Sequence, residues 1–366
     1  MPSSKLLDWR WWFGLQRKEL TLSPPAMSVS VVVPAYNEAA NIAATIRSLQ
    51  EQTYKLAEII VVDDCSSDGT GDIARSLGAT VIRPEKNQGT KAQAQNCALP
   101  FITTELFMTV DADTVVAPNG VYEAMKAFND PRTEVVHGSV IPQKIKTFWE
   151  YGRLIEYLYA RAILKPAQEH NDMVMVASGC FSIFKTETVK KYGGFDPRTM
   201  VEDFDMTCSI HEDGGYVRFQ SKAVCYAMEP ETLKVYISQL DRWYRGFFQV
   251  LKVRNYRPFP NNKRMKFILY FYLFWYGISA VILPLSIFAF TRNIVETMLW
   301  VLAVNAVILW IPALVSGVRI GVPWWKIVLG FGPNLVTPYV NMYVYFRSFW
   351  REVITNQKLT VWEKGH

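Results

Sequence analysis

Three long stretches near the C-terminus carry no charged side chain and limit what this chain can fold into. They are Phe267–Phe290, Met298–Val318 and Ile327–Phe346. An apolar run of about 20 residues is long enough to cross a bilayer as a helix. The third run contains Gly330, Gly332, Pro333 and Pro338. Because these residues interrupt helices, we predict two transmembrane spans, at about 267–290 and 298–318, and a broken or re-entrant stretch over 327–346.

Basic residues flank these stretches unevenly and predict their orientation. Lys252, Arg254, Arg257, Lys263, Arg264 and Lys266 precede the first stretch, and the loop after it has the single basic residue Arg292. The tail, 347–366, is basic again. The positive-inside rule therefore places both the preceding domain and the tail in the cytoplasm. Two spans plus a re-entrant stretch satisfy that parity, so we expect a multi-pass protein of the plasma membrane.

Residues 1–27 are expected to form a separate N-terminal unit. Trp9, Trp11, Trp12 and Phe13 alternate with basic residues over Lys5–Lys18, a segment too short and too charged to span a bilayer. Such a segment is typical of an amphipathic helix lying at the membrane interface. The alternative is a surface helix packed on its own domain. A Pro-containing linker over 21–27 follows.

Strand-like and helix-like patterns alternate from residue 28 to about 230. The predicted strands are Val29–Val33, Ala57–Val62, Thr80–Ile82 and Leu106–Val110, and the predicted helices are Glu38–Gln50, Thr70–Leu77 and Gly89–Leu99. Alternation of this kind predicts an α/β domain with a largely parallel sheet. Amphipathic helices over Lys146–Leu164 and Thr232–Val250 follow, and the second belongs to a unit of interface helices over 231–266.

Acidic residues follow two of the predicted strands at their carboxyl ends. Asp63 and Asp64 end one strand, and Asp111 and Asp113 follow Leu106–Val110. Ligands of open α/β sheets bind at these strand ends. Carboxylate oxygens suit a hard divalent cation, so Asp111 and Asp113 are candidate ligands for Mn²⁺ or Mg²⁺. Taken alone, either pair has the alternative interpretation of a turn or a cap.

Further polar motifs occur in a fixed order along the chain. They are Pro34–Glu38 (PAYNE), the pair Glu202-Asp203, and Gln239-Leu-Asp-Arg242-Trp243. Arg242 carries a planar, permanently charged fork that suits a diphosphate. Its alternative role is an ion pair on the helix surface. Trp243 offers a flat face for a sugar ring, and its alternative role is core packing.

In this order and followed by membrane stretches, the motifs resemble those of family-2 glycosyltransferases of the GT-A fold. The similarity is greatest to the membrane-embedded branch with the D, D, D, QxxRW pattern, which includes hyaluronan, chitin-oligosaccharide, poly-N-acetylglucosamine and cellulose synthases. It covers about Val29–Trp243. The resemblance implies an α/β GT-A nucleotide-sugar-binding domain with a Rossmann-like mixed sheet, joined to C-terminal transmembrane helices and interfacial amphipathic helices.

The resemblance also implies roles for residues of the donor side, which would bind a UDP-sugar. The uridine is expected to contact Ala35, Tyr36, Glu38 and Asp63 or Asp64. The metal would be bound by Asp111 and Asp113, and the diphosphate by Arg242, with Lys91 and Arg245 as further candidates. Thr90 separates Gly89 from Lys91, whereas many relatives have Lys directly after the Gly, so the donor contact of Lys91 is an open point.

On the acceptor side, the resemblance implies that Asp203 is the general base and that Glu202 tunes it. One carboxylate acting as base in a single displacement predicts inversion, and thus a β-linkage from an α-configured donor. The small-residue loop with Ser178 and Gly179 matches the family's loop near the acceptor, and Gln239 and Trp243 are further candidates for substrate binding. The four histidines, His137, His170, His211 and His366, are scattered and predicted to be structural.

Several functions stay open at this point. The first is a processive synthase that extends a β-linked polysaccharide from a UDP-sugar, with a homo-oligomer or partner subunit completing the export path. The second is a glycolipid synthase that acts on a ceramide- or diacylglycerol-like lipid, and the third a polyprenyl-phosphate sugar transferase. A non-catalytic nucleotide-sugar-binding subunit disagrees with the intact carboxylates. A nucleic-acid partner is not expected, because the basic residues cluster beside the apolar stretches.

Overall fold

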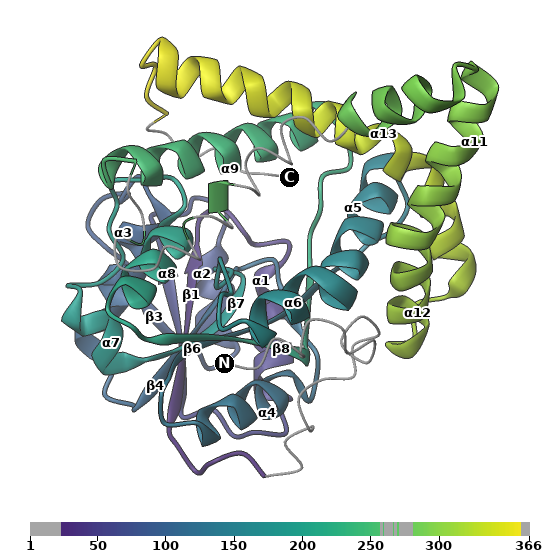
Figure 1. Cartoon of the computed structure of the whole chain (residues 1–366). Helices are drawn as coiled ribbons and strands as arrows, with labels where there is room; N and C mark the ends of the chain where they lie inside the picture. Colours follow the sequence, from purple (N-terminus) through teal and green to yellow (C-terminus); the bar gives the residue numbers. More distant parts are fainter. Residues whose placement is uncertain (1–22, 257–258, 260–265, 267–268, 271–280, 360–366) are drawn as a thin grey trace.

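The structure is a computed structural model that describes residues 23–256, 259, 266, 269–270 and 281–359. The predicted N-terminal interfacial helix and half of the first predicted span lie outside these residues, as do Trp362 and His366 of the tail. Figure 1 shows the two parts of the described chain: a sheet with its flanking helices, and a group of C-terminal helices beside and above it.

One mixed sheet of eight strands forms the centre of the domain, in the order β3-β2-β1-β4-β7-β6-β8-β5. The strands are β1 (Val29–Ala35), β2 (Glu58–Asp63), β3 (Thr80–Ile82), β4 (Leu106–Val110), β5 (Val115–Val116), β6 (Thr133–Pro142), β7 (Phe181–Lys185) and β8 (Tyr216–Ala227). Strands β1 to β4 are parallel, but β7 runs antiparallel to both β4 and β6. Strand β6 therefore runs in the same direction as β4, β8 is parallel to β6, and β5 is antiparallel to β8. Of the eight strands only β7 and β5 run against the others, so both the predicted largely parallel sheet and the mixed sheet implied by the family resemblance are confirmed.

Helices cover both faces of this sheet, because its central strands are apolar on both sides. Val31 and Val33 of β1 join one core, whereas Val32 between them joins the other. The first core is closed by α1 (Ile42–Gln50), α2 (Thr70–Ser76) and α4 (Gly120–Met125). The second is closed by α3 (Lys91–Ala98), α7 (Thr186–Lys191) and α8 (Glu202–Glu212). The predicted helix over Glu38–Gln50 begins only at Ile42, because Glu38 is held in a turn by Thr70.

A second group of helices lies over the carboxyl edge of the sheet (Figure 1). It consists of α5 (Phe148–Tyr159), α6 (Lys165–His170), α9 (Leu233–Val253), α11 (Ile294–Asn305), α12 (Ile311–Arg319) and α13 (Trp324–Phe349). Single π-helical turns, η4 (Ala160–Leu164), η5 (Ala306–Trp310) and η6 (Trp350–Ile354), continue α5, α11 and α13. Helix α13 contacts both α5 and α9, which ties the C-terminal helices to the sheet domain.

The helical segment Ile294–Arg319 coincides with the second predicted span. The most apolar 18-residue window of this segment has a mean hydropathy of 2.3, and only 6% of that window is buried. Within the described part of the chain it is the one helix long and apolar enough to cross a membrane. The region of the first predicted span contributes the shorter apolar helix Val281–Thr291.

Residues 327–346 belong to a single helix, α13, where the sequence predicted a broken or re-entrant stretch. Pro333 and Pro338 lie inside it without ending it. The reason is close packing on α5: a Cβ on Gly330 would stand 2.7 Å from Ile155, and a Cβ on Gly152 of α5 would stand 2.7 Å from Thr337. The two helices approach through their glycines, and this contact offsets the hydrogen bonds that proline removes.

Candidate active site

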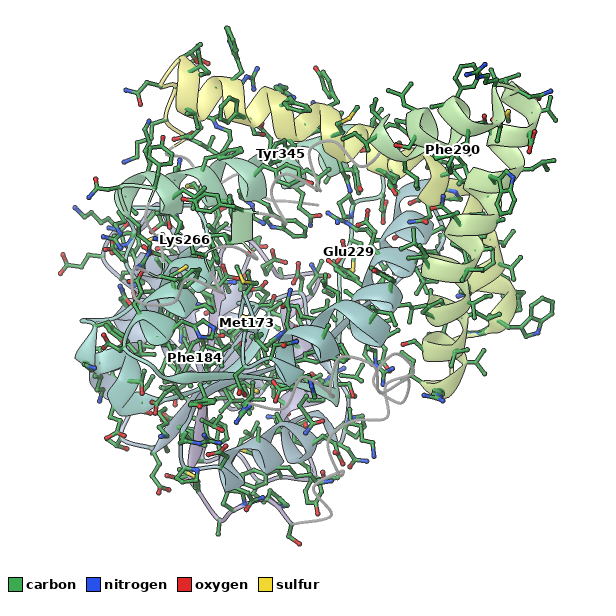
Figure 2. All side chains as sticks on the ribbon, viewed as in Figure 1. Met173, Phe184, Glu229, Lys266, Phe290 and Tyr345 are labelled. Atoms are coloured by element: carbon green, nitrogen blue, oxygen red, sulfur yellow. The ribbon has the colours of Figure 1, made fainter. Side chains whose placement is uncertain are left out.

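A cavity of about 750 Å³ opens between the carboxyl edge of the sheet and the helices α5, α9 and α13. We call it the central cavity. Tyr36 after β1, Asp113 after β4, Asp203 at the start of α8 and Trp243 on α9 all line it. Figure 2 labels two further lining residues, Glu229 beside α5 and Tyr345 on α13. A volume in this range suits a small ligand bound at the strand ends of an α/β sheet.

Asp111 and Asp113 follow β4 directly and both line the central cavity. Their loop is fixed, because Thr45 Oγ1 donates to the carbonyl of Ala112 at 2.8 Å and the amide of Thr114 donates to the carbonyl of Asp111 at 3.0 Å. The Asp111 side chain is 35% exposed. Among the described residues no group of three His, Cys, Asp or Glu side chains could hold a metal. Two carboxylates fit a divalent ion whose other ligands are phosphate and water oxygens.

Lys91, the first residue of α3, already places a cation at this point. Its ammonium contacts Asp111 Oδ1 and lies 3.8 Å from Glu202 Oε1. Burial lowers the pKa of Lys91, but the charges of Asp111 and Glu202 outweigh it and raise the pKa above its ordinary value. Thr90 caps the helix by accepting from the amide of Gln93 at 3.2 Å. The extra residue before Lys91 is thus a helix cap. The Lys91 ammonium still contacts Asp111, one of the two candidate metal ligands.

Glu202 and Asp203 open α8 and face the cavity from the other side. Asp203 accepts from the amide of Gly179 at 2.9 Å through Oδ2 and from the amide of Phe204 at 2.7 Å through Oδ1. These bonds fix the plane of the carboxylate. Burial raises the pKa of Glu202 to about 7, Lys91 lowers it and Asp203 raises it further.

The loop Ser178-Gly179-Cys180 lies between Lys91 and Asp203. All three of its residues line the central cavity. A Cβ on Gly179 would stand 2.8 Å from Lys91 Nζ and 3.5 Å from Asp203 Oδ2. Glycine at this position therefore allows the lysine and the carboxylate to approach the same loop.

The ends of β1 and β2 form the opposite wall. Ala35, Tyr36, Glu38 and Asp64 line the cavity there, and Asp64 Oδ1 accepts from the amide of Gln88 at 2.8 Å. Burial raises the pKa of Asp64, while the bond from Gln88 opposes that shift.

Asp63, the other candidate of this pair, does not reach the cavity. Consecutive side chains of a strand point to opposite faces. The Asp63 carboxylate is fully buried, where it accepts from the amide of Ser66 at 3.0 Å and contacts Arg83. It stabilises the turn after β2, so the prediction that Asp63 or Asp64 contacts the ligand narrows to Asp64.

The motif on α9 faces the cavity with Gln239, Arg242 and Trp243. Arg153 of α5 donates from Nη2 to Gln239 Oε1 at 2.7 Å, and its guanidinium carbon lies 4.7 Å from the centre of the Trp243 ring. Nε of Arg242 is buried and has no hydrogen-bond partner among the described residues.

Arg245 of the same helix points elsewhere. Its Nε donates to Glu352 Oε2 at 3.1 Å, and its side chain is absent from the cavity lining. The prediction of Arg245 as an additional donor contact is therefore wrong, because this arginine instead joins α9 to η6.

Comparison with known proteins finds similarity over part of the chain. Residues 30–193 match the family model "Glycosyl transferase family 2". The chain is 28% identical over 258 residues to the poly-beta-1,6-N-acetyl-D-glucosamine synthase of Staphylococcus aureus, covering 69% of this chain and 62% of the relative. It is 27% identical over 280 residues to the synthase of the same name from Staphylococcus epidermidis, covering 73% of this chain and 66% of the relative. The chain thus spans less than two thirds of the length of these relatives.

A solved structure shares the fold of almost the whole chain. A mannosyltransferase from Pyrobaculum calidifontis, solved in complex with GDP-Man and Mn²⁺, superposes with a TM-score of 0.61 at 21% identity, covering 96% of this chain and 94% of its own. The likeness therefore extends beyond the residues that match the family model, to the helices that close the central cavity.

The central cavity also has lining residues that sequence reasoning missed. Arg153 pairs with Glu156 at 2.7 Å and with Glu229 at 3.5 Å, and the Tyr157 hydroxyl donates to Glu229 at 2.8 Å. Burial raises the pKa of Glu229 to about 7, against the opposing charge of Arg153. The sequence signal for these residues was the polar face of α5 at residues 153, 156 and 157. The apolar pattern that predicted this helix does not show that its polar face lines a cavity. Glu229 stands in no recognisable pattern.

His137 and Lys165 also line the cavity, and the sequence motifs did not identify them as site residues. His137 was predicted to be structural, like the other histidines. It is 3% exposed and its ring lies 5.1 Å from that of Phe219, which agrees with a packed position, but it also borders the cavity. No sequence pattern marks His137 or Lys165 as a cavity residue, because neither belongs to one of the polar motifs.

Proposed function

We propose that this chain is an inverting, metal-dependent glycosyltransferase that moves a sugar from a UDP-sugar to a growing β-linked polysaccharide. The observation that carries the proposal is the arrangement around one cavity of Asp111 and Asp113 on one side, Asp203 on the other, and Gln239, Arg242 and Trp243 above. At one end of the cavity, Asp111 and Asp113 would hold the metal that neutralises the leaving diphosphate. At the other end, the Asp203 carboxylate would act as the base.

The donor would lie along the strand ends. Tyr36, Glu38 and Asp64 are placed to contact the uridine, and Asp64 can accept from the uracil N3–H. Asp111 and Asp113 would hold Mn²⁺ or Mg²⁺, which when bound neutralises the departing diphosphate. Lys91 and Arg242 add fixed positive charge, and the unused Nε of Arg242 is a spare donor for a phosphate oxygen. The mannosyltransferase that shares the fold was solved with a nucleotide sugar and Mn²⁺, which supports this placement.

The acceptor would approach from the side of α5, α8 and α9. Asp203 is held by two backbone amides, so its carboxylate is oriented before a substrate binds. It would accept the proton of the attacking hydroxyl as the bond to the sugar forms and the UDP leaves. With one carboxylate as base and a single displacement, the product is inverted. Trp243 lines the cavity with its ring, against which a sugar can lie.

The relatives that the chain matches are named as polysaccharide synthases, which supports a saccharide acceptor over a glycolipid or polyprenyl-phosphate product. For the membrane, the helix Ile294–Arg319 supports at least one span. We propose that the catalytic domain faces the cytoplasm beside the plasma membrane, and that a second copy or a partner subunit completes the export path.

A product assay tests this function. The purified full-length protein is incubated with Mn²⁺ and a panel of UDP-sugars, UDP release is followed, and the product is sized. We expect release that needs the metal and a long polymer sensitive to a β-glycosidase. A chloroform-soluble product with a single sugar would reject the polysaccharide acceptor and support a glycolipid.

A further inference from the structure

Three basic side chains at one end of the central cavity have no acidic partner among the described residues. They are His137 of β6, Arg161 of η4 and Lys165 of α6, and all three line the cavity. We call them the basic end. Two other cations of the cavity are paired, since Lys91 contacts Asp111 and Arg153 contacts Glu156 and Glu229. A third, Arg242, lies on α9 and is assigned above to the diphosphate. Among the described residues, none of the three side chains of the basic end forms an ion pair with a carboxylate.

The partners of these side chains are neutral. Lys165 Nζ donates to the carbonyl of Val176 at 3.0 Å. Arg161 donates from Nε to the carbonyl of Ser221 at 3.2 Å and from Nη1 to Ser316 Oγ at 3.0 Å. His137 is 3% exposed, and within the described chain neither of its ring nitrogens has a hydrogen-bond partner. The cations of the basic end are therefore bound only by neutral oxygens, and the ring nitrogens of His137 are bound by no group of the described chain.

Two local irregularities bring these residues together. The π-helical turn Ala160–Leu164 widens the helix where Arg161 and Lys165 enter the cavity lining. The pairing of β6 with β8 shifts register between Gly138 and Ser139. The bulge turns the carbonyl of Ser221 toward the helix, where it accepts from Arg161 and from Ser139 Oγ at 3.0 Å. π-Helical turns and β-bulges are frequent at functional sites, where they re-aim side chains.

Arg161 and Lys165 are half-buried cations without a carboxylate partner among the described residues, and such an arrangement is costly. Burial lowers the pKa of Lys165 to about 8, and the charges of Asp203 and Cys180 oppose that shift. Burial also lowers the pKa of His137 well below its ordinary value, and the charge of Lys165 lowers it further. An anion bound here would relieve both effects. Because Lys165 is within reach of the charge of Asp203, the anion would lie on the side of the catalytic base, away from Tyr36 and Asp64.

Resting on the proposed function, we propose that the basic end binds an oxyanion carried by the acceptor, a carboxylate or a phosphate close to the hydroxyl that Asp203 activates. Lys165 and Arg161 supply the charge and His137 supplies a hydrogen bond. Because the proposed acceptor is a saccharide, it would then be an acidic one that bears a uronate. The basic end selects such an acceptor over its neutral analogue, because the neutral analogue leaves the half-buried cations unpaired.

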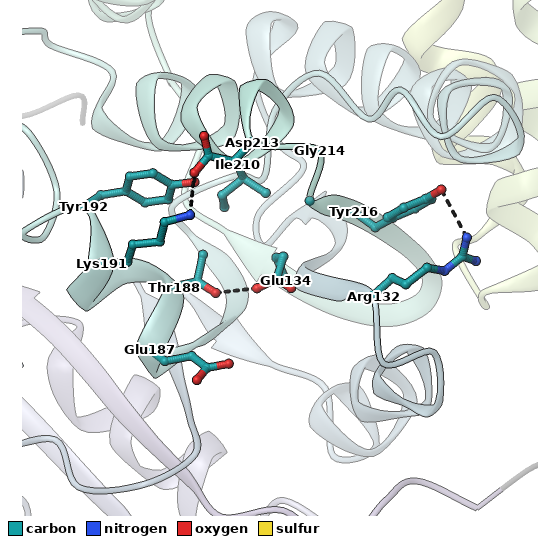
Figure 3. A pocket seen from close by; sticks show the side chains of 11 residues that line it. Arg132, Glu134, Glu187, Thr188, Lys191, Tyr192, Ile210, Asp213, Gly214 and Tyr216 are labelled. Atoms are coloured by element: carbon teal, nitrogen blue, oxygen red, sulfur yellow. Dashed lines mark hydrogen bonds and ion pairs between the residues drawn. The ribbon is translucent and has the colours of Figure 1, made fainter.

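A second hollow among the described residues has no comparable set of basic side chains without acidic partners. It measures about 640 Å³ and lies at the far end of α7 and α8 (Figure 3). Lys191 and the Tyr192 hydroxyl both bind Asp213, at 2.6 and 2.8 Å, and Arg132 binds Asp130 at 2.7 Å. These charges satisfy one another without a ligand, so the hollow gives no comparable argument.

The test uses the full-length protein, one UDP-sugar and acceptors in matched pairs. A uronate-bearing oligosaccharide is compared with its carboxyl-reduced form, and a lipid phosphate with the corresponding lipid alcohol. The wild type is expected to prefer the uronate-bearing oligosaccharide over its carboxyl-reduced form. Preference for the lipid phosphate instead would keep an acidic acceptor but reject the polysaccharide acceptor. Lys165→Met should raise the KM for that acceptor about 10–100-fold relative to its neutral counterpart. Lys165→Arg should restore the preference, and the exposed control Lys144→Met should keep it.

The outcomes separate the two proposals. Absence of metal-dependent UDP release with every acceptor rejects the proposed function. Release that is equal for acidic and neutral acceptors in the wild type rejects the acidic acceptor alone. The same follows if Lys165→Met raises the KM equally for both members of a pair. A loss of UDP affinity in Lys165→Met, measured by calorimetry, would assign the lysine to the donor and likewise overturn the inference.

Discussion

Arg153 Nη2 on α5 donates a hydrogen bond of 2.7 Å to Gln239 Oε1 on α9, although the two residues are 86 positions apart in the chain. The same guanidinium lies against Trp243 and between Glu156 and Glu229. Gln239, the first residue of the QxxRW motif, thus links α9 to α5, while Arg242 and Trp243 of the motif line the central cavity.

Arg153→Met is expected to destabilise the fold. Glu229 is 3% exposed, and loss of its cation leaves a buried charge unpaired when the carboxylate is ionised. We expect a loss of about 3–5 kcal/mol in the free energy of unfolding near pH 8.5. Thermal unfolding in detergent measures it. The double variant Arg153→Met/Glu229→Gln should recover most of the loss, and an equal loss in both variants would contradict the pairing.

Asp203→Asn should abolish transfer while UDP binding is retained. The amide oxygen can still accept from the amide of Gly179, but it cannot take the proton of the acceptor. Loss of a general base costs about 10²–10⁴-fold in kcat. The measurement pairs UDP-release kinetics with calorimetry of UDP binding. Asp213→Asn, at the other end of α8, is the matched control and should transfer at the wild-type rate. Weaker UDP binding in Asp203→Asn would assign this carboxylate to the donor instead.

Asp113→Ala should remove the metal dependence of donor binding. With Asp111 alone, and with that carboxylate already in contact with Lys91, too few oxygen ligands remain for a divalent ion. We expect Mn²⁺ to strengthen UDP binding at least about tenfold in the wild type and not in the variant. Calorimetric titration of UDP with and without Mn²⁺ checks this. Unchanged enhancement in the variant would show that the metal is held elsewhere.

Glu229→Gln should change how stability depends on pH. Burial raises the pKa of Glu229 from 4.5 to about 7, so the folded chain holds this proton more tightly than the unfolded chain. The resulting stabilisation is fully present below the unfolded pKa and is lost as the pH rises to about 7. The variant lacks this loss, so its stability relative to the wild type should increase by about 3 kcal/mol between pH 4.5 and 7.5. Thermal unfolding midpoints across that range measure the difference, and parallel curves would disprove the shift.

Gly330→Ala should loosen α13 from α5. The new Cβ would stand 2.7 Å from Ile155 and 2.9 Å from the carbonyl of Tyr151, and overpacking of this kind costs about 1–3 kcal/mol. Gly332 is the matched control in the same helix, because a Cβ there meets nothing within 4 Å. Gly332→Ala should be neutral or stabilise by about 0.5–1 kcal/mol through helix propensity. Equal effects of the two substitutions on the unfolding midpoint would contradict close packing at Gly330.

The strand ends illustrate what local sequence can predict. Apolar runs that stop at polar residues identified β1, β2 and β4 to within two residues, because burial of a strand is a property of its own side chains. The same pattern predicted that Asp111 and Asp113 face a ligand. It could not choose between Asp63 and Asp64, since one faces Arg83 and the other the cavity, and that choice depends on which face α2 covers.

By itself, the sequence determined the α/β domain, the order of its carboxylates and the amphipathic helix with Gln239, Arg242 and Trp243, since each rests on the spacing of neighbouring residues. The tertiary structure alone decided that α13 is continuous, that Arg245 turns to Glu352, and that Arg153, Glu229, Lys165 and His137 meet in one cavity. These outcomes depend on contacts between segments far apart in the chain. Packing of α13 on α5 overrides two prolines, and a shared cavity gives meaning to single polar residues that no local pattern marks.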